Sequence, residues 1–295
     1  MLITLMNALT AFQQNPPFFC FASGILALLI GSFLNVVIYR LPKMMEAEWK
    51  KECKQFLGTD EDIPPEPGFN LVFPGSTCPN CQNKIHPLDN IPVISYLLLK
   101  GSCRNCKQRI SPRYPLIELA SCLLIIAVAI EYGVSIQAFF AFLFTWSLIA
   151  LAVIDYDHKL LPDNITLPFM WLGIICNLFG IFTDIESSLF GAIFGYLVLW
   201  TVFVIFKLIT GKEGMGYGDF KLLAMLGAWL GWQYLPLIII LSSFTGSIVG
   251  AGLLLLSKHK KSQPIPFGPF LAIAGWIALM YGDLLTGLYI DWAFK

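Results

Sequence analysis

Long apolar runs alternate with short polar segments along most of this 295-residue chain. A run of about 20 apolar residues lets a helix cross the hydrocarbon core of a bilayer. The pattern therefore predicts an all-α polytopic membrane protein with about eight transmembrane helices, of which the sixth is short for a full crossing. The runs are Phe18–Tyr39, Pro115–Ile130, Ile136–Ile154, Ile165–Thr183, Ser188–Ile209, Phe220–Leu230, Leu235–Leu256 and Phe267–Tyr289.

One stretch, residues 40–114, interrupts this pattern. It holds half of all the charged residues and is rich in Pro, Asn and Cys, which is more typical of a small loop-rich fold than of a long helix. We therefore predict three parts. These are an N-terminal segment with the first transmembrane helix (1–39), a soluble cytoplasmic domain (40–114) and a multi-helix transmembrane domain (115–295).

Composition and charge narrow the possible functions. Apolar residues make up 57% of the chain, charged residues 13%, and the formal net charge is zero. This balance argues against a basic nucleic-acid-binding protein and against a disordered one. When residues 40–114 are placed in the cytoplasm, every Lys and Arg except Lys295 falls on that side or at an inner helix end. The first run lacks a preceding basic segment, so we expect a retained helix rather than a signal peptide.

Four cysteines of the soluble stretch form two Cys-x-x-Cys pairs, Cys78/Cys81 and Cys103/Cys106. Two short turns that each present two thiolates are typical of a tetrahedral structural zinc site. Two disulfides are the alternative, but a reducing cytoplasm disfavours them. A redox pair does not usually occur twice at such spacing. Because four thiolates complete the coordination of zinc, we expect a structural role for this metal in a zinc-ribbon-like domain.

Two acidic stretches adjoin apolar runs. The first, Asp155–Asp163, carries three carboxylates, and the second, Gly214–Lys221, has alternating glycines before Asp219. Ionisable residues at such positions are functional candidates, although a polar turn is the simpler interpretation of the first. A phosphate-binding loop would need a preceding strand, whereas an apolar run precedes Gly214. We expect the glycines to permit an unusual backbone path and the close approach of an extended substrate chain.

The predicted topology puts Asp155 at the inner end of the third helix and Asp219 at the inner start of the sixth. Two carboxylates that meet in a low-dielectric site cannot both ionise, so one keeps its proton while the other accepts one from water. This is the arrangement of an aspartic protease, in which activated water attacks a peptide carbonyl. The sequence thus favours peptide hydrolysis at the inner membrane surface.

Five motifs follow one another along the chain: Gly31–Pro42, the paired Cys-x-x-Cys turns, Arg113–Glu118, Asp155–Asp163 and Gly216–Lys221. In this order they resemble the motifs of the type IV prepilin peptidases, or leader peptidase/N-methyltransferases. This family is similar to other intramembrane aspartyl proteases that carry a GxGD motif.

The resemblance implies that Asp155 and Asp219 are the catalytic pair. It implies removal of the leader from type IV prepilins and type II secretion pseudopilins, after a Gly on the cytoplasmic side. It also implies methylation of the new N-terminus with S-adenosylmethionine, in the inner membrane of a bacterium. The partners are then the prepilins, the pseudopilins and the lipid bilayer, with no nucleic acid. Supporting roles are expected for Gly216, Gly218, Lys221 and Asp163.

The site for S-adenosylmethionine is not predicted, because no glycine-rich turn follows a strand as in a Rossmann fold. Residues 40–114 are the first candidate for assisting methyl transfer. Two other classes of protein share some of these features. A proton-coupled transporter with a zinc-stabilised loop would need its acids for transport and would cut no peptide. A scaffold of a secretion complex would tolerate the loss of both Asp155 and Asp219.

Overall fold

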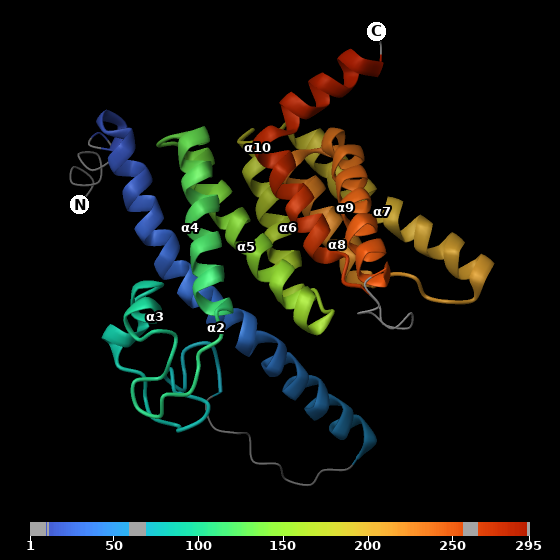
Figure 1. The fold of residues 1–295 in the computed structure, drawn as a ribbon. Coiled ribbons are helices and arrows are strands. Elements are labelled where there is room, and N and C mark those ends of the chain that lie inside the picture. The colour runs from blue at the N-terminus through green and yellow to red at the C-terminus, as the bar shows by residue number, and fades with distance from the viewer. Residues whose placement is uncertain (1–9, 11, 59–68, 256–264, 294–295) are drawn as a thin grey trace. The chain divides into compact units, whose positions relative to one another are not determined.

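The computed structural model describes residue 10 and residues 12–58, 69–255 and 265–293. Within these residues the chain forms helices joined by turns and no β-strand (Figure 1). It divides into two compact units, Met1–Val134 and Ser135–Lys295. The three parts predicted from the sequence have boundaries after residues 39 and 114. These boundaries were placed from the distribution of charged residues, not from packing, and they stay a prediction. The basic segment Lys258–Lys261, placed inside by the topology, lies outside the described residues.

The first unit is built on two long helices, α2 (Pro16–Leu57) and α4 (Arg113–Tyr132). They pack closely because Gly31 of α2 has no side chain. A Cβ at Gly31 would lie 2.9 Å from Cα of Glu118. One turn before Gly31 in α2, the carbonyl of Ala27 accepts a hydrogen bond of 2.8 Å from the Ser121 hydroxyl of α4. Small residues and hydrogen-bonding hydroxyls at such an interface are typical of helices packed within a membrane.

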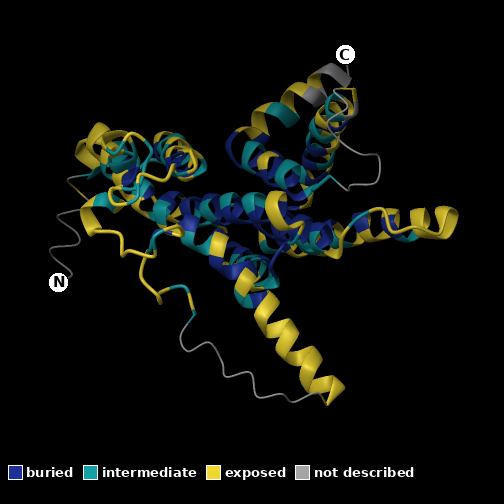
Figure 2. Ribbon diagram, turned by 60° about the horizontal axis from the view of Figure 1, so that its bottom comes forward, coloured by how far each residue is buried: buried dark blue, intermediate teal, exposed yellow. Residues whose placement is uncertain are grey.

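Helix α2 does not end at Tyr39, where the apolar run ends. It continues through Lys- and Glu-rich sequence to Leu57 and stops at Gly58, which has a left-handed backbone with φ 64°. Lys, Glu, Met and Ala are good helix formers, and the extension is largely exposed (Figure 2). The expectation of a loop-rich fold therefore fails for residues 40–57. Irregular structure begins at residue 69 of the described chain and contains only η1 (Pro87–Asn90) and α3 (Ile94–Leu98).

The second unit is a bundle of six longer helices joined by turns. Its members are α5 (Ile136–His158), α6 (Asp163–Leu178), α7 (Ile185–Thr210), α8 (Tyr217–Leu230), α9 (Leu235–Leu255) and α10 (Gly268–Ala293). The described part of each of the eight predicted runs thus lies largely in a helix, which confirms an all-α membrane fold. Among the described residues, six helices are long and apolar enough to cross a membrane: α2, α4, α5, α7, α9 and α10.

Helix α8 occupies the centre of the second unit. It packs on α6, α7 and α10, and every residue from Leu222 to Leu230 is buried. A helix of 14 residues is about 21 Å long, which is less than the ~30 Å of a bilayer core. Its apolar residues on all sides reflect burial among other helices. By contrast, α7 exposes many large apolar side chains, as a helix in contact with lipid would.

Glycines hold α7 against α8. A Cβ at Gly191 would lie 2.1 Å from the carbonyl oxygen of Gly227, and one at Gly195 would lie 2.6 Å from that of Leu223. Gly191 and Gly195 are spaced as in the small-xxx-small motif that lets two membrane helices approach closely. The position of α8, and therefore of Asp219 at its start, depends on this contact.

We expect Gly191→Ala to push α7 away from α8, because the added methyl group meets backbone rather than a mobile side chain. Overpacking of this kind lowers the free energy of unfolding by about 1–3 kcal/mol. Thermal unfolding of the purified protein in detergent measures the effect. Gly252→Ala in α9 is the matched control, since a Cβ there meets nothing within 4 Å. Equal melting temperatures for the two variants would contradict the proposed role of Gly191.

Candidate active site and candidate metal centre

Two buried carboxylates come together in the second unit. Asp155 lies in the last turn of α5 and Asp219 in the first turn of α8, and they are only 6% and 7% exposed. They are close enough for their charges to repel each other. The structure therefore brings together the two acids that the sequence pattern singled out. Each carboxylate is largely removed from water, so a single proton shared by the pair relieves the repulsion.

The end of α5 explains why Asp155 and not Asp157 faces the site. The helix stops at Lys159, whose backbone is left-handed with φ 53° and whose N–H donates to the Asp155 carbonyl at 2.8 Å. Residues two positions apart point to nearly opposite sides of a helix. Asp155 is thus buried, whereas Asp157 is exposed.

A third helix end contacts Asp155, although the sequence did not predict this contact. The backbone N–H of Gly268, the first residue of α10, donates a hydrogen bond of 2.9 Å to Oδ2 of Asp155. The N-terminus of a helix carries partial positive charge, which stabilises negative charge on this carboxylate. A Cβ at Gly268 would lie 2.6 Å from the same oxygen. The visible signal was Pro266-Phe-Gly268-Pro269 just before an apolar run.

The glycines before Asp219 do not adopt the unusual backbone path that the sequence predicted, whereas the approach of a substrate chain stays a prediction. Gly216 precedes α8 with φ −83°, and no left-handed backbone occurs at Gly214, Gly216 or Gly218. A Cβ at Gly218 would lie 2.8 Å from Cβ of Leu161. The close approach at Gly218 is therefore to the chain's own Asp155–Asp163 segment. Gly216 is exposed and open, and its backbone N–H contacts the Asp219 carboxylate.

An ion pair joins the two acidic stretches. Lys221 Nζ lies 2.8 and 2.7 Å from the two carboxylate oxygens of Asp163. Asp163 begins α6 and Lys221 lies in the second turn of α8. The pair is partly exposed, so its effect is mainly to hold the start of α6 beside the start of α8. Asp163 and Lys221 thus lie next to the carboxylate pair without being part of it.

The four paired cysteines meet in the first unit. The Sγ atoms of Cys78, Cys81, Cys103 and Cys106 all lie within 4.8 Å of one another. Each pair sits in a short turn closed by one antiparallel bridge, Thr77–Lys84 in one and Ser102–Arg109 in the other. A cluster of four soft sulfur ligands fits zinc, which prefers tetrahedral thiolate coordination.

Groups around the sulfurs also suit a metal. The backbone N–H of Gln108 and the Asn80 side chain lower the pKa of Cys106 to about 6, which favours the thiolate. A backbone N–H lowers the pKa of Cys81 too, but burial and the neighbouring sulfurs outweigh it and raise this pKa to about 11. The cluster therefore resists holding four negative charges unless a cation is present. A divalent metal would remove that penalty.

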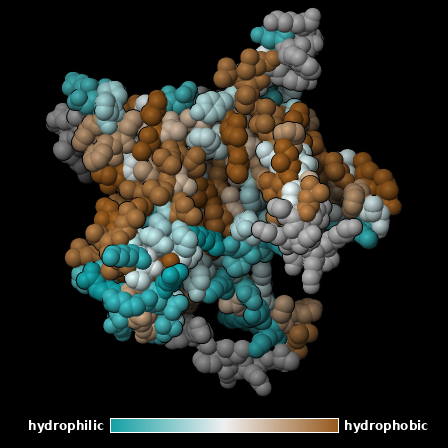
Figure 3. All heavy atoms as spheres, viewed as in Figure 1, coloured by the Kyte–Doolittle hydropathy of each residue, from teal (hydrophilic) through white to brown (hydrophobic). Residues whose placement is uncertain are grey.

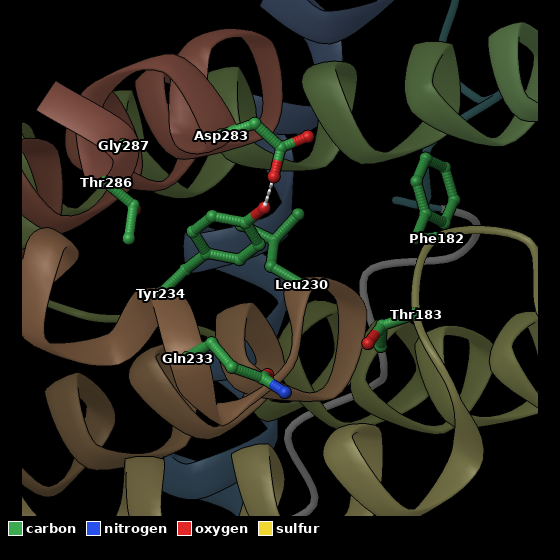
Figure 4. Close-up of a pocket in the computed structure, with 8 residues that line it drawn as sticks. All are labelled: Phe182, Thr183, Leu230, Gln233, Tyr234, Asp283, Thr286 and Gly287. Carbon is green, nitrogen blue, oxygen red and sulfur yellow. Dashed lines mark hydrogen bonds between the residues drawn. The ribbon is translucent and has the colours of Figure 1, made fainter. Parts of the chain in front are cut away.

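A cavity of about 440 Å³ lies at the other end of α8 (Figure 4). There the Tyr234 hydroxyl donates a hydrogen bond to the Asp283 carboxylate. The cavity is lined by Phe182, Thr183, Leu230, Gln233, Tyr234, Asp283, Thr286 and Gly287. Because its only α8 residue is Leu230, at the opposite end of that helix from Asp219, it is separate from the carboxylate pair.

Two family models match this chain. Residues 25–132 match the bacterial peptidase A24 N-terminal domain, and residues 142–251 match the type IV leader peptidase family. The second match contains both Asp155 and Asp219. No solved structure shows a significant match.

Curated relatives resemble nearly the whole chain. A prepilin leader peptidase/N-methyltransferase of Pseudomonas aeruginosa is 54% identical over 98% of this chain and 99% of its own length. The protein of that name from Aeromonas hydrophila is 54% identical over 90% of this chain and 91% of its own length. The one from Legionella pneumophila is 40% identical over 98% of this chain and 99% of its own length. Identity at this level and coverage means that the chain belongs to the type IV leader peptidase family.

Proposed function

We propose that this chain is a membrane aspartic peptidase that removes the leader of type IV prepilins and of type II secretion pseudopilins. The cut follows a Gly on the cytoplasmic side, and the new N-terminus is then methylated. The pairing of the buried Asp155 and Asp219 carboxylates carries this proposal. Relatives named prepilin leader peptidase/N-methyltransferase support the choice of substrate. The transporter and scaffold alternatives have no comparable support.

Peptide hydrolysis by the pair needs one ionised and one protonated carboxylate. The ionised carboxylate takes a proton from water as the water oxygen bonds to the scissile carbonyl carbon. The protonated carboxylate donates to the carbonyl oxygen and stabilises the charge that develops there. When the C–N bond breaks, a proton moves to the departing amine. The Gly268 N–H keeps Asp155 in place throughout.

The substrate enters as a hydrophobic helix whose charged leader remains in the cytoplasm. Its scissile bond therefore lies near the membrane surface, at the depth expected for acids in the end turns of α5 and α8. A helix hides its carbonyls in internal hydrogen bonds, so the segment must unwind locally before it is cut. The Gly216–Gly218 turn lies next to Asp219, and we assign its backbone to hold that extended segment.

Methyl transfer uses S-adenosylmethionine, which supplies the methyl group that the new terminal amine attacks. The described residues contain no strand–turn–helix unit for a Rossmann-type site. We therefore assign the cofactor to no residue of this chain. We place the protein in the inner membrane of a bacterium, with the cysteine cluster and the carboxylate pair on the cytoplasmic side, because that orientation satisfies the positive-inside rule.

Cleavage of a prepilin peptide by the purified, reconstituted protein tests the proposed function. Mass spectrometry of the products is expected to show a cut directly after the Gly, and an added methyl group only when S-adenosylmethionine is present. If the protein transported protons but left the peptide intact, the result would favour the transporter alternative. A cut without methylation would limit the proposal to its peptidase part.

Cys78→Ser is expected to remove the structural zinc ion. The purified protein should carry about one zinc per chain, and the variant should lose most of it because three sulfurs leave the tetrahedron open. Elemental analysis measures the metal, and limited proteolysis follows the order of residues 69–112. Cys53→Ser is the matched control, since Cys53 is exposed and lies outside the cluster. Equal zinc contents in the two variants would contradict the assignment.

A further inference from the structure

The soluble part of the first unit exposes an unusual number of large apolar side chains. Leu97 and Leu98 of α3 are 67% and 78% exposed, and Leu88 and Ile94 are 64% and 54% exposed. A free surface of this kind marks an interaction site on a protein that is otherwise polar there. In Figure 3, hydrophobic atoms of α2 and α4 continue onto the side where Figure 1 places α3.

Glu118 fixes the position of α3 relative to helix α4. Its buried carboxylate accepts a hydrogen bond of 2.8 Å from the backbone N–H of Val93, the residue before α3. Val93 has φ 60°, an uncommon conformation for a β-branched residue. Glu118 lies five residues beyond Arg113, the first residue of α4, which is about 8 Å along the axis. Helix α3 therefore begins level with the interior of α4 rather than beyond its end.

The start of α4 is the level at which we expect the boundary between lipid and water. Helix α4 is long and apolar enough to span the membrane, and a basic residue such as Arg113 marks the headgroup region at its start. Tyr114 and Leu116 of α4 are exposed on the same unit. The apolar side chains of α3 thus continue a surface that already faces lipid.

The charge next to α3 suits an acidic bilayer. Residues 84–113 contain six basic residues and one acidic residue, Asp89, which pairs with Arg104. Apolar side chains bordered by Lys and Arg are typical of elements that lie in the interface of anionic membranes. The basic residues are Lys84, Lys100, Arg104, Lys107, Arg109 and Arg113.

We propose that α3 and the preceding Leu88–Val93 segment insert into the bilayer interface, with the surrounding Lys and Arg side chains on acidic phospholipid headgroups. The part of the chain that carries the four-cysteine cluster then rests on the membrane surface and is not held away from it in the cytoplasm. Glu118 is the positioning residue that holds α3 at this depth. This proposal does not depend on the peptidase assignment, because it concerns only the first unit.

Photolabelling by lipid tests the proposal. The full-length protein is placed in nanodiscs of phosphatidylcholine with about 30% phosphatidylglycerol and a phospholipid that carries a diazirine near its headgroup. Tryptic peptides separate Ile85–Lys100, which contains α3, from Met44–Lys50 in the exposed part of α2. We expect at least about fivefold more label on Ile85–Lys100. Omitting phosphatidylglycerol should lower that label about threefold.

Variants separate lipid contact from other causes of labelling. Leu97→Ser with Leu98→Ser should lower the label on this peptide several-fold, whereas Phe56→Ser with Leu57→Ser, an exposed apolar pair at the end of α2, should leave it unchanged. Glu118→Ala should lower it as well, and Glu118→Gln should lower it less. Equal labelling of the two wild-type peptides would overturn the proposal without any variant. A cross-link from Leu98 to a second copy of the chain would also overturn it.

Discussion

Asp155→Asn and Asp219→Asn are each expected to lower prepilin cleavage by about 10²–10⁴-fold or more, because each removes one member of an acid–base pair. An amide can neither take a proton from water nor donate one to the carbonyl oxygen. The same side-chain volume is kept, so the helix ends are expected to stay in place. Initial rates of leader release by the reconstituted protein, at saturating peptide, measure the loss.

Asp157→Asn is the matched control for this experiment. It makes the same chemical change two residues from Asp155, on an exposed side chain at the same helix end. Most of the activity should remain. If either Asp155→Asn or Asp219→Asn kept near-normal cleavage, or if Asp157→Asn abolished it equally, the assignment of the pair would be wrong. Asp155→Asn and Asp219→Asn should both still methylate a peptide that already lacks its leader. This result would separate the methyltransferase activity from the peptidase activity.

The membrane helices and the two acids could be predicted because both depend on residue type and on spacing along the chain. Each apolar run is a helix, and Asp155 and Asp219 stand out against sequence with few charges. The number of helices that cross the membrane was harder to predict from the sequence. An apolar run such as Phe220–Leu230 has the same composition whether it faces lipid or lies among other helices, and only packing shows that α8 is buried.

Other features were hidden because they depend on the backbone. Helix α2 continues past Tyr39 because its charged residues are also good helix formers, so a change in polarity was not a change in secondary structure. The contact of Gly268 with Asp155 uses an N–H that every residue except proline has. The identity of Gly268 therefore does not indicate that its partner is Asp155, which is more than a hundred residues away in the sequence.

Gly268→Ala is expected to reduce cleavage by at least about tenfold, since misplacing a reacting group by about 1 Å can cost 10²-fold. The added Cβ would lie 2.6 Å from Oδ2 of Asp155 and 3.0 Å from its Cγ. Either the start of α10 or the carboxylate must therefore move, and the 2.9 Å hydrogen bond is lost or lengthened. The peptide's KM should change little if the effect is on the carboxylate rather than on substrate binding.

Gly287→Ala makes the same substitution in the same helix where a Cβ meets nothing within 4 Å, so it should cleave normally. Alanine has the higher helix propensity, so any loss at Gly268 cannot come from a weaker helix. A purely structural role would lower the melting temperature and the activity together, whereas a positioning role lowers kcat at an unchanged melting temperature. Equal kcat values for Gly268→Ala and Gly287→Ala would show that the start of α10 does not position Asp155.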